Sequence, residues 1–72
     1  MNYSKANKRQ GYHLKSTGKG KYSFTNNQGI EYKAVREKNG KGYSLYIKDY
    51  NGYEYIETVD SYAEAVYNLN TR

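Results

Sequence analysis

Few residues of this chain can form a hydrophobic core. The 72-residue chain has no cysteine, so neither a disulfide nor a thiolate-bound metal can hold a small fold together. Its 11 tyrosines must supply part of the core, because a tyrosine ring buries a large apolar area while its hydroxyl stays hydrated. One small domain is the most that we expect. The large aliphatic residues are only Leu14, Ile30, Val35, Leu45, Ile47, Ile56, Val59, Val66 and Leu69.

Charge is distributed unevenly along the chain. The net charge is +5, and the first acidic residue is Glu31. From residue 49 onward the chain has five acidic residues, and its only basic residue is Arg72. This asymmetry indicates a basic surface that binds a polyanion, rather than a charged surface that only contacts water. The basic residues that come before any acid are Lys5, Lys8, Arg9, Lys15, Lys19 and Lys21.

The sequence offers little that could carry catalysis. Its single histidine, His13, has no cysteine or carboxylate at a spacing typical of a catalytic triad. The glycine–lysine runs at 18–21 and 40–42 lack the strand, loop and helix order of a P-loop. We therefore expect no enzymatic activity, no cofactor and no metal. No apolar run is long enough for a membrane span or a signal-peptide core, so we also expect no membrane association.

Composition divides the chain into two parts. Residues 1–20 are rich in Lys, Asn, Ser and Gly and are predicted to form a basic flexible tail. The alternative is that part of this segment docks on the fold, since Tyr12 and Leu14 have the spacing of a short strand. Residues 21–72 are predicted to form a single domain. Strands are expected at 30–36, 43–49 and 53–59, separated by turns at 39–42 and at Asn51-Gly52, where both residues tolerate positive φ. A short extra strand at 22–25 is compatible with this pattern.

A helix is predicted at the end of the chain. Ser61 and Glu64 have the spacing of a capping box. An apolar stripe follows at helical spacing, and this stripe should cover one face of the sheet. The predicted fold is α+β, a three-stranded antiparallel meander packed against one C-terminal helix. The stripe consists of Tyr62, Ala65, Val66 and Leu69.

Alternation along the strands predicts which residues the helix covers. The covered face should hold Val35, Leu45, Ile47 and Ile56. The uncovered face mixes cations with tyrosines, which is typical of nucleic-acid surfaces, although tyrosines also cover solvent-facing strands for their β propensity alone. The residues assigned to the uncovered face are Ala34, Arg36, Lys38, Ser44, Tyr46, Lys48, Tyr53, Tyr55 and Glu57.

The segment 32–70 resembles a known family. It contains Tyr-Lys-Ala-Val-Arg at 32–36, Tyr-Ser-Leu-Tyr-Ile-Lys-Asp at 43–49 and Ile-Glu-Thr-Val-Asp at 56–60 before the helix. In this order the motifs resemble the AP2-type DNA-binding domain. The segment is also similar to the N-terminal arm-binding domains of tyrosine integrases. The resemblance implies a three-stranded sheet lying in the DNA major groove. Lysine stands where the family mostly has arginine, so we expect weak specificity. The implied contact residues are Lys33, Arg36, Lys38, Tyr46, Lys48 and Tyr55.

The functional prediction is a small DNA-binding module of phage or mobile-element type. Its partner would be double-stranded DNA, and it would act in the cytoplasm of a bacterial host cell. Tyr53 joins the predicted contacts through its place on the uncovered face. An alternative is a phage-encoded inhibitor, for example an anti-CRISPR, that binds a host nuclease or its guide RNA. A third interpretation uses the tyrosines as sugar-stacking platforms. The oligomeric state stays open.

Overall fold

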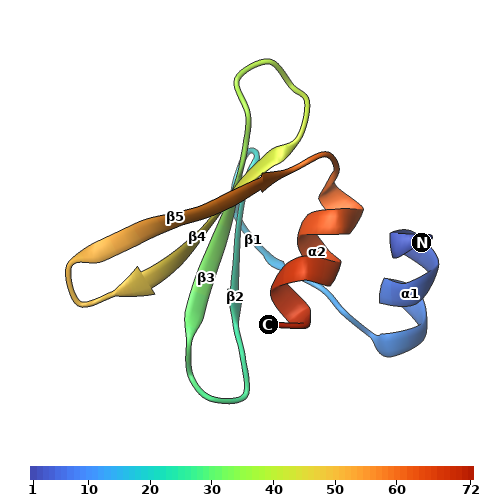
Figure 1. The fold of residues 1–72 in the computed structure, drawn as a ribbon, viewed down its shortest axis with the longest axis horizontal. Helices are drawn as coiled ribbons and strands as arrows, with labels where there is room; N and C mark the ends of the chain where they lie inside the picture. The colour runs from blue at the N-terminus through green and yellow to red at the C-terminus, as the bar shows by residue number, and fades with distance from the viewer.

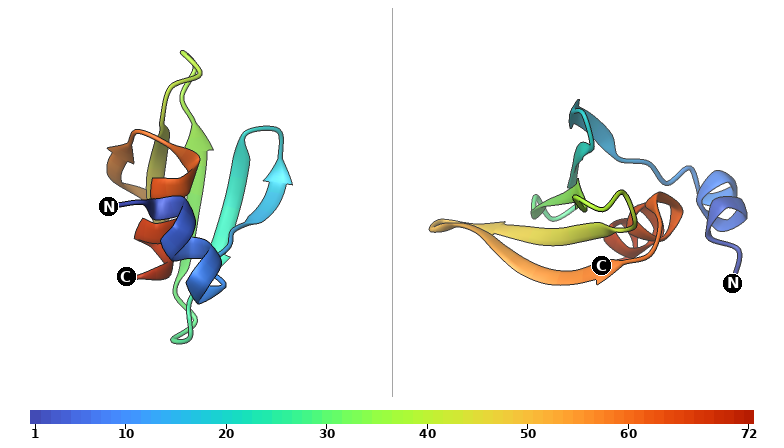
Figure 2. Two further views of the ribbon diagram at one scale, coloured as in Figure 1. Left: turned by 90° about the vertical axis from the view of Figure 1, so that its right-hand side faces the viewer. Right: turned by 90° about the horizontal axis from the view of Figure 1, so that it is seen from above.

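Five antiparallel strands form one sheet, and each strand pairs with the next strand along the chain. The computed structural model describes all 72 residues. Two helices lie on the same side of the sheet, with α2 against the strands and α1 beyond α2 (Figure 1; Figure 2). The elements are α1 (Tyr3–Gln10), β1 (Lys15–Gly18), β2 (Lys21–Thr25), β3 (Glu31–Arg36), β4 (Tyr43–Asp49), β5 (Gly52–Val59) and α2 (Tyr62–Asn70).

The prediction of three strands and one helix is therefore wrong. The structure has five strands and two helices. The possible extra strand at 22–25 is present as β2. The elements α1 and β1 escaped a search for apolar periodicity because they bury few apolar side chains. All four residues of β1 are exposed, and the only buried residue of α1 is Asn7. Other signals were present: Asn2 caps α1 by accepting a hydrogen bond from the Lys5 N–H, and Gly11 ends it with φ of 72°.

Residues 1–20, predicted to be a flexible tail, contain α1 and β1. The predicted boundary falls in the turn between β1 and β2, which pair with each other. Asn7 Nδ2 donates a hydrogen bond of 2.9 Å to the Ala63 carbonyl of α2. The ring of Tyr67 lies 5.2 Å from that of Tyr3 and 6.2 Å from that of Tyr12. Polar and aromatic contacts thus attach this segment, and a count of aliphatic residues does not detect them.

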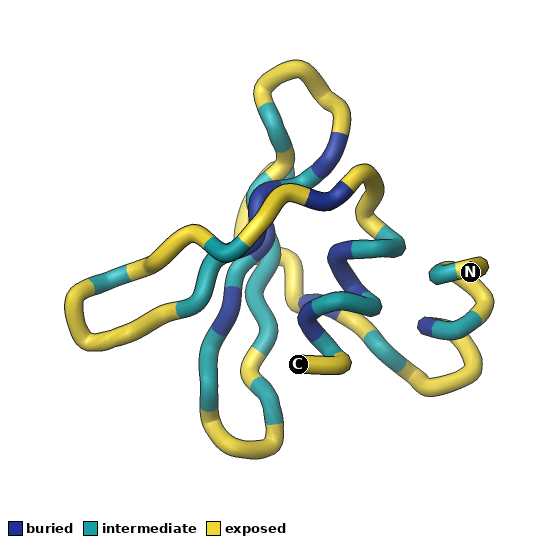
Figure 3. Tube along the Cα trace, in the orientation of Figure 1, coloured by how far each residue is buried: buried dark blue, intermediate teal, exposed yellow.

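The helix α2 forms as its sequence predicts. Ser61 Oγ accepts a hydrogen bond from the Glu64 N–H at the start of the helix. Ala65, Val66 and Leu69 are buried and belong to the hydrophobic core. Figure 3 shows the buried positions along α2. The strands and the preceding segment contribute the remaining buried apolar residues, which are Leu14, Tyr32, Ala34, Leu45 and Val59.

In β3 the alternation was assigned with the wrong phase. The sequence interpretation placed Val35 in the core and Ala34 outside. Ala34 is opposite Leu45 and has no exposed surface, whereas Val35 is opposite Ser44 on the other face. Tyr32, only 5% exposed, lies in the core on the same face as Ala34. Because side chains alternate every residue, this single error moved the whole strand to the wrong face.

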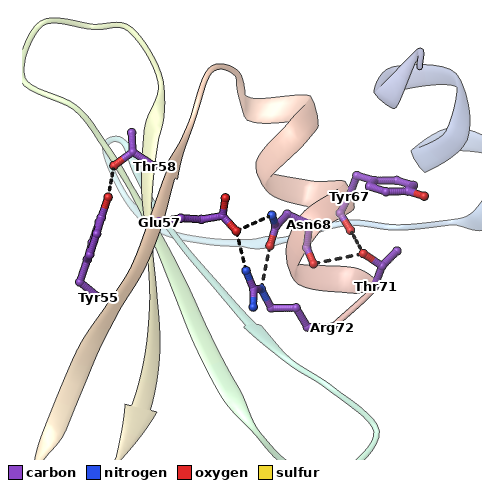
Figure 4. Close-up of polar contacts among 7 residues, drawn as sticks. All are labelled: Tyr55, Glu57, Thr58, Tyr67, Asn68, Thr71 and Arg72. Atoms are coloured by element: carbon purple, nitrogen blue, oxygen red, sulfur yellow. Dashed lines mark hydrogen bonds and ion pairs between the residues drawn. The ribbon is translucent and has the colours of Figure 1, made fainter.

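In β5 a bulge interrupts the alternation. Tyr46 pairs with Tyr55, but its neighbour Leu45 pairs with Glu57, so Ile56 is the extra residue. Tyr55 and Glu57 therefore point to opposite sides of the sheet (Figure 4). Glu57 faces α2, where its carboxylate accepts hydrogen bonds from Asn68 and from Arg72. The prediction that Glu57 lies on the uncovered face is wrong.

Candidate nucleic-acid interface

The sheet has one face that neither helix covers, here called the open face. Opposed residues of an antiparallel pair share a face, so the strand register identifies its members. Starting from Lys33, the register leads to Tyr46 and Tyr55 in one direction and to Ser23 and Lys15 in the other. The open face consists of Lys15, Lys21, Ser23, Thr25, Glu31, Lys33, Val35, Ser44, Tyr46, Lys48, Tyr53, Tyr55 and Thr58.

Lys33 is surrounded by tyrosines near the middle of the open face. Its Nζ lies 4.1 Å from the ring centroid of Tyr53 and 5.1 Å from that of Tyr46. Tyr46 in turn lies edge-on to Tyr55, with 5.9 Å between ring centroids. The ammonium group is thus held over aromatic faces by cation–π attraction, while Tyr53 and Tyr55 remain exposed.

The open face carries a single acidic residue, and its carboxylate already has partners. Glu31 accepts a hydrogen bond of 2.8 Å from the Tyr53 hydroxyl, and its other oxygen lies 3.9 Å from Lys48 Nζ. The bond to this carboxylate, together with desolvation and the carboxylate's charge, raises the pKa of Tyr53 above its ordinary value. Lys15, Lys21 and Lys33 form no salt bridge, so the face has an excess of positive charge.

Hydroxyl groups line the β4–β5 side of the open face. The Tyr55 hydroxyl lies 2.7 Å from Thr58 Oγ1, which is 3.2 Å from Ser44 Oγ (Figure 4 shows the Tyr55–Thr58 contact). Each hydroxyl can donate or accept, so this group can hydrogen-bond to phosphate oxygens or to base edges. The contact also holds the Tyr55 ring in one orientation.

The structure brings together five of the seven predicted contact residues. Lys33, Tyr46, Lys48, Tyr53 and Tyr55 lie on the open face. The resemblance was the only argument for Lys33, because the wrong phase in β3 had excluded it.

The other two predicted contact residues lie elsewhere. Arg36 is opposite Tyr43, on the side that the helices occupy, and Lys38 lies in the turn after β3. Sequence reasoning missed Lys15 and Lys21 as members of the open face. Only the cross-strand register of β1 and β2, which was not predicted, could have placed them there.

Two hollows adjoin the open face. One of about 310 Å³ lies next to Lys33 and is lined also by Thr17, Lys21 and Glu31. The other, of about 840 Å³, lies where β2 ends near the C-terminal end of α2. No acidic side chain lines the larger hollow, and its walls include His13, Lys15, Asn27, Gln28 and Arg72. Both hollows are open at the surface, so the open face is a shallow surface without an enclosed pocket.

No family model, no curated protein sequence and no solved structure matches this chain, so nothing identifies an AP2-type or integrase arm domain. No helix has the length and apolar character needed to cross a membrane. No three His, Asp or Glu side chains gather as they would around a metal ion. The chemistry of the open face is thus the main guide to function.

Proposed function

We propose that this chain binds duplex DNA through the open face of its sheet. The observation that carries the proposal is the position of Lys33, a cation that projects among exposed tyrosines on a face with only one carboxylate. Lys15 and Lys21 extend the positive charge across β1 and β2. Lysines neutralise phosphates, and tyrosines pack against sugars and bases, so the face offers both kinds of contact.

The width of the sheet favours contacts with the phosphate backbone. Five strands at a spacing of about 4.8 Å span roughly 19 Å, whereas the major groove is about 12 Å wide. The whole sheet is therefore too broad to lie in the groove as a three-stranded sheet would. Lys15 and Lys21 of β1 and β2 would contact phosphates on one side of the groove. Tyr46 of β4 and Tyr55 of β5 would lie toward the other side. Such binding depends strongly on salt and discriminates weakly between sequences.

The proposal is tested by comparing two charge reversals. Lys33→Glu places a carboxylate in the middle of the open face. Arg36→Glu makes the same change in net charge on the same strand but on the other side of the sheet. Fluorescence anisotropy with a labelled duplex at fixed salt should show that Lys33→Glu lowers the affinity for the duplex at least tenfold. The loss for Arg36→Glu should be a few-fold, because only long-range attraction changes.

Three outcomes would contradict the proposal. Equal losses in the two variants would mean that net charge alone drives the binding. No detectable binding of duplex by the wild type would exclude the function. A clear preference for single-stranded DNA or for RNA over duplex would replace the proposed ligand. In each case circular dichroism must first show that both variants are folded.

A further inference from the structure

Helix α1 has two faces with different roles. At about 100° per residue, Tyr3, Ala6, Asn7 and Gln10 lie on one side of the helix. This is the side that contacts α2, through the Asn7 bond to Ala63 and the ring of Tyr3 against Tyr67. The opposite side of α1 must therefore point away from α2. That side carries Lys5, Lys8 and Arg9.

These three cations form a basic surface that nothing in the protein neutralises. Lys5, Lys8 and Arg9 are all exposed, and none takes part in a salt bridge. No acidic residue precedes Glu31 in the chain. Lys8 and Arg9 lie in the last turn, where the helix dipole favours positive charge, but this effect does not account for Lys5. The three residues are called the α1 basic face below.

The α1 basic face and the open face point in opposite directions. The order of layers is open face, sheet, α2 and then α1 (Figure 1; Figure 2). The folded chain extends 35 × 32 × 20 Å, and its core lies between the two basic surfaces. A straight duplex seated on the open face cannot touch Lys5, Lys8 or Arg9 on the far side. The amino-terminal cations therefore cannot act as an arm for that duplex.

We propose that the α1 basic face binds a second duplex segment, so that one molecule bridges two pieces of DNA. The inference rests on the proposed function, because the first duplex occupies the open face. Charge complementarity identifies the second occupant: three cations without a neighbouring acid match a row of phosphates. Few phosphates are neutralised there, so the second contact is the weaker and the more easily lost in salt.

The experiment is a two-duplex capture assay with the full chain. One duplex of about 20 base pairs, roughly 70 Å long at 3.4 Å per base pair, is attached to beads. A second duplex of the same length carries a fluorophore and is added with the protein at low salt. Wild-type protein should hold the second duplex on the beads. Changing Lys5, Lys8 and Arg9 together to Gln should lower this capture at least fivefold, while the affinity for a single duplex falls less than threefold.

A matched variant controls for net charge. Changing Lys19, Lys38 and Lys41 to Gln removes the same three charges from turns of the sheet. This control should keep most of the capture. Glutamine is a good helix former, and unchanged circular dichroism would confirm that α1 persists in the first variant.

The proposal and the function on which it rests can fail separately. A wild type that binds one duplex but captures no second duplex would overturn bridging and leave the open face intact. Equal loss of capture in both triple variants would also overturn it. Capture that survives the α1 changes in full would indicate bridging by a dimer through two open faces. Absence of any duplex binding would overturn both proposals together.

Discussion

The tyrosines of this chain lie in different environments, some in the core and some on the open face. Tyr32 is 5% exposed and fills the core, whereas Tyr53 is 41% exposed and flanks Lys33 on the open face. Tyr22, Tyr43 and Tyr62 pack against one another on the helix side, with ring centroids 4.8 to 6.1 Å apart. Their rings extend a core that has few aliphatic residues. Residue type alone therefore does not tell which tyrosines lie in the core and which lie on the open face.

A pH titration tests the contact between Tyr53 and Glu31. Because the Tyr53 hydroxyl donates to the Glu31 carboxylate, its pKa lies above the ordinary value of 10.0 in the folded protein. The raised pKa means that this contact stabilises the fold below about pH 10, where unfolded tyrosine titrates, and that the contribution disappears as pH rises through the folded-state pKa. NMR titration of the tyrosine ring carbons should show this pKa falling toward 10.0 in Glu31→Gln. An identical Tyr53 titration in both proteins would contradict the contact.

At the scale of elements, the turns decide which strands can pair. The two-residue loop between β4 and β5 is Tyr50-Asn51, with Asp49 Oδ1 accepting a hydrogen bond from the Asn51 N–H. A hairpin forms here as predicted, but its loop begins one residue before the predicted Asn51-Gly52 turn, and only Gly52 has positive φ. At the other end of β4, Gly42 is buried with φ of 85° and lies directly against the backbone of β5.

Substitution of Gly42 should be far more harmful than substitution of Gly29. Both glycines have φ near 80°, so alanine costs about 1–2 kcal/mol of backbone strain at either position. At Gly42 the new Cβ would also lie 2.5 Å from the Val59 carbonyl oxygen, whereas at Gly29 nothing lies within 4 Å. Urea unfolding should show a loss of at least about 3 kcal/mol for Gly42→Ala and about 1 kcal/mol for Gly29→Ala. Similar losses would mean that β5 does not approach Gly42 so closely.

At the scale of the whole molecule, one thin core joins sheet, α2 and the segment before β1. Leu45 and Leu69 are its largest fully buried side chains. The free energy of unfolding for 72 residues is expected to be roughly 4–11 kcal/mol. Loss of one central contact is therefore a large share of the total.

Two substitutions, one in the core and one on the open face, test which face of the sheet α2 covers. Leu69→Ala should lower the free energy of unfolding by about 2–5 kcal/mol, because the cavity lies between helix and sheet. Val35→Ala should cost only about 1 kcal/mol, because Val35 is half-buried on the open face. Thermal and urea unfolding followed by circular dichroism measure both. A larger loss of unfolding free energy for Val35→Ala than for Leu69→Ala would mean that Val35 lies in the core, as the sequence predicted. That result would contradict the register described here.

Local signals in the sequence were enough to predict α2, a hairpin between β4 and β5, and the strands β3, β4 and β5. Each of these features depends on contacts within a few residues: the Ser61 cap, the apolar stripe that ends at Leu69, and the alternation of β4. The same reasoning assigned the predicted contact residues of β4 and β5 to the open face, because alternation holds from Tyr46 to Lys48 and across the hairpin to Tyr55. The resemblance added Lys33.

The tertiary structure alone decided the rest. The phase of β3 depends on Tyr32 filling the core, and the side on which Glu57 lies depends on a bulge in β5. The elements α1 and β1 exist through partners distant in sequence, since Asn7 bonds to Ala63 and Lys15 pairs with Ser23. A chain with so little aliphatic surface relies on polar and aromatic contacts between segments. Such contacts have no sequence period, so only the folded arrangement reveals them and the two basic faces that they place on opposite sides.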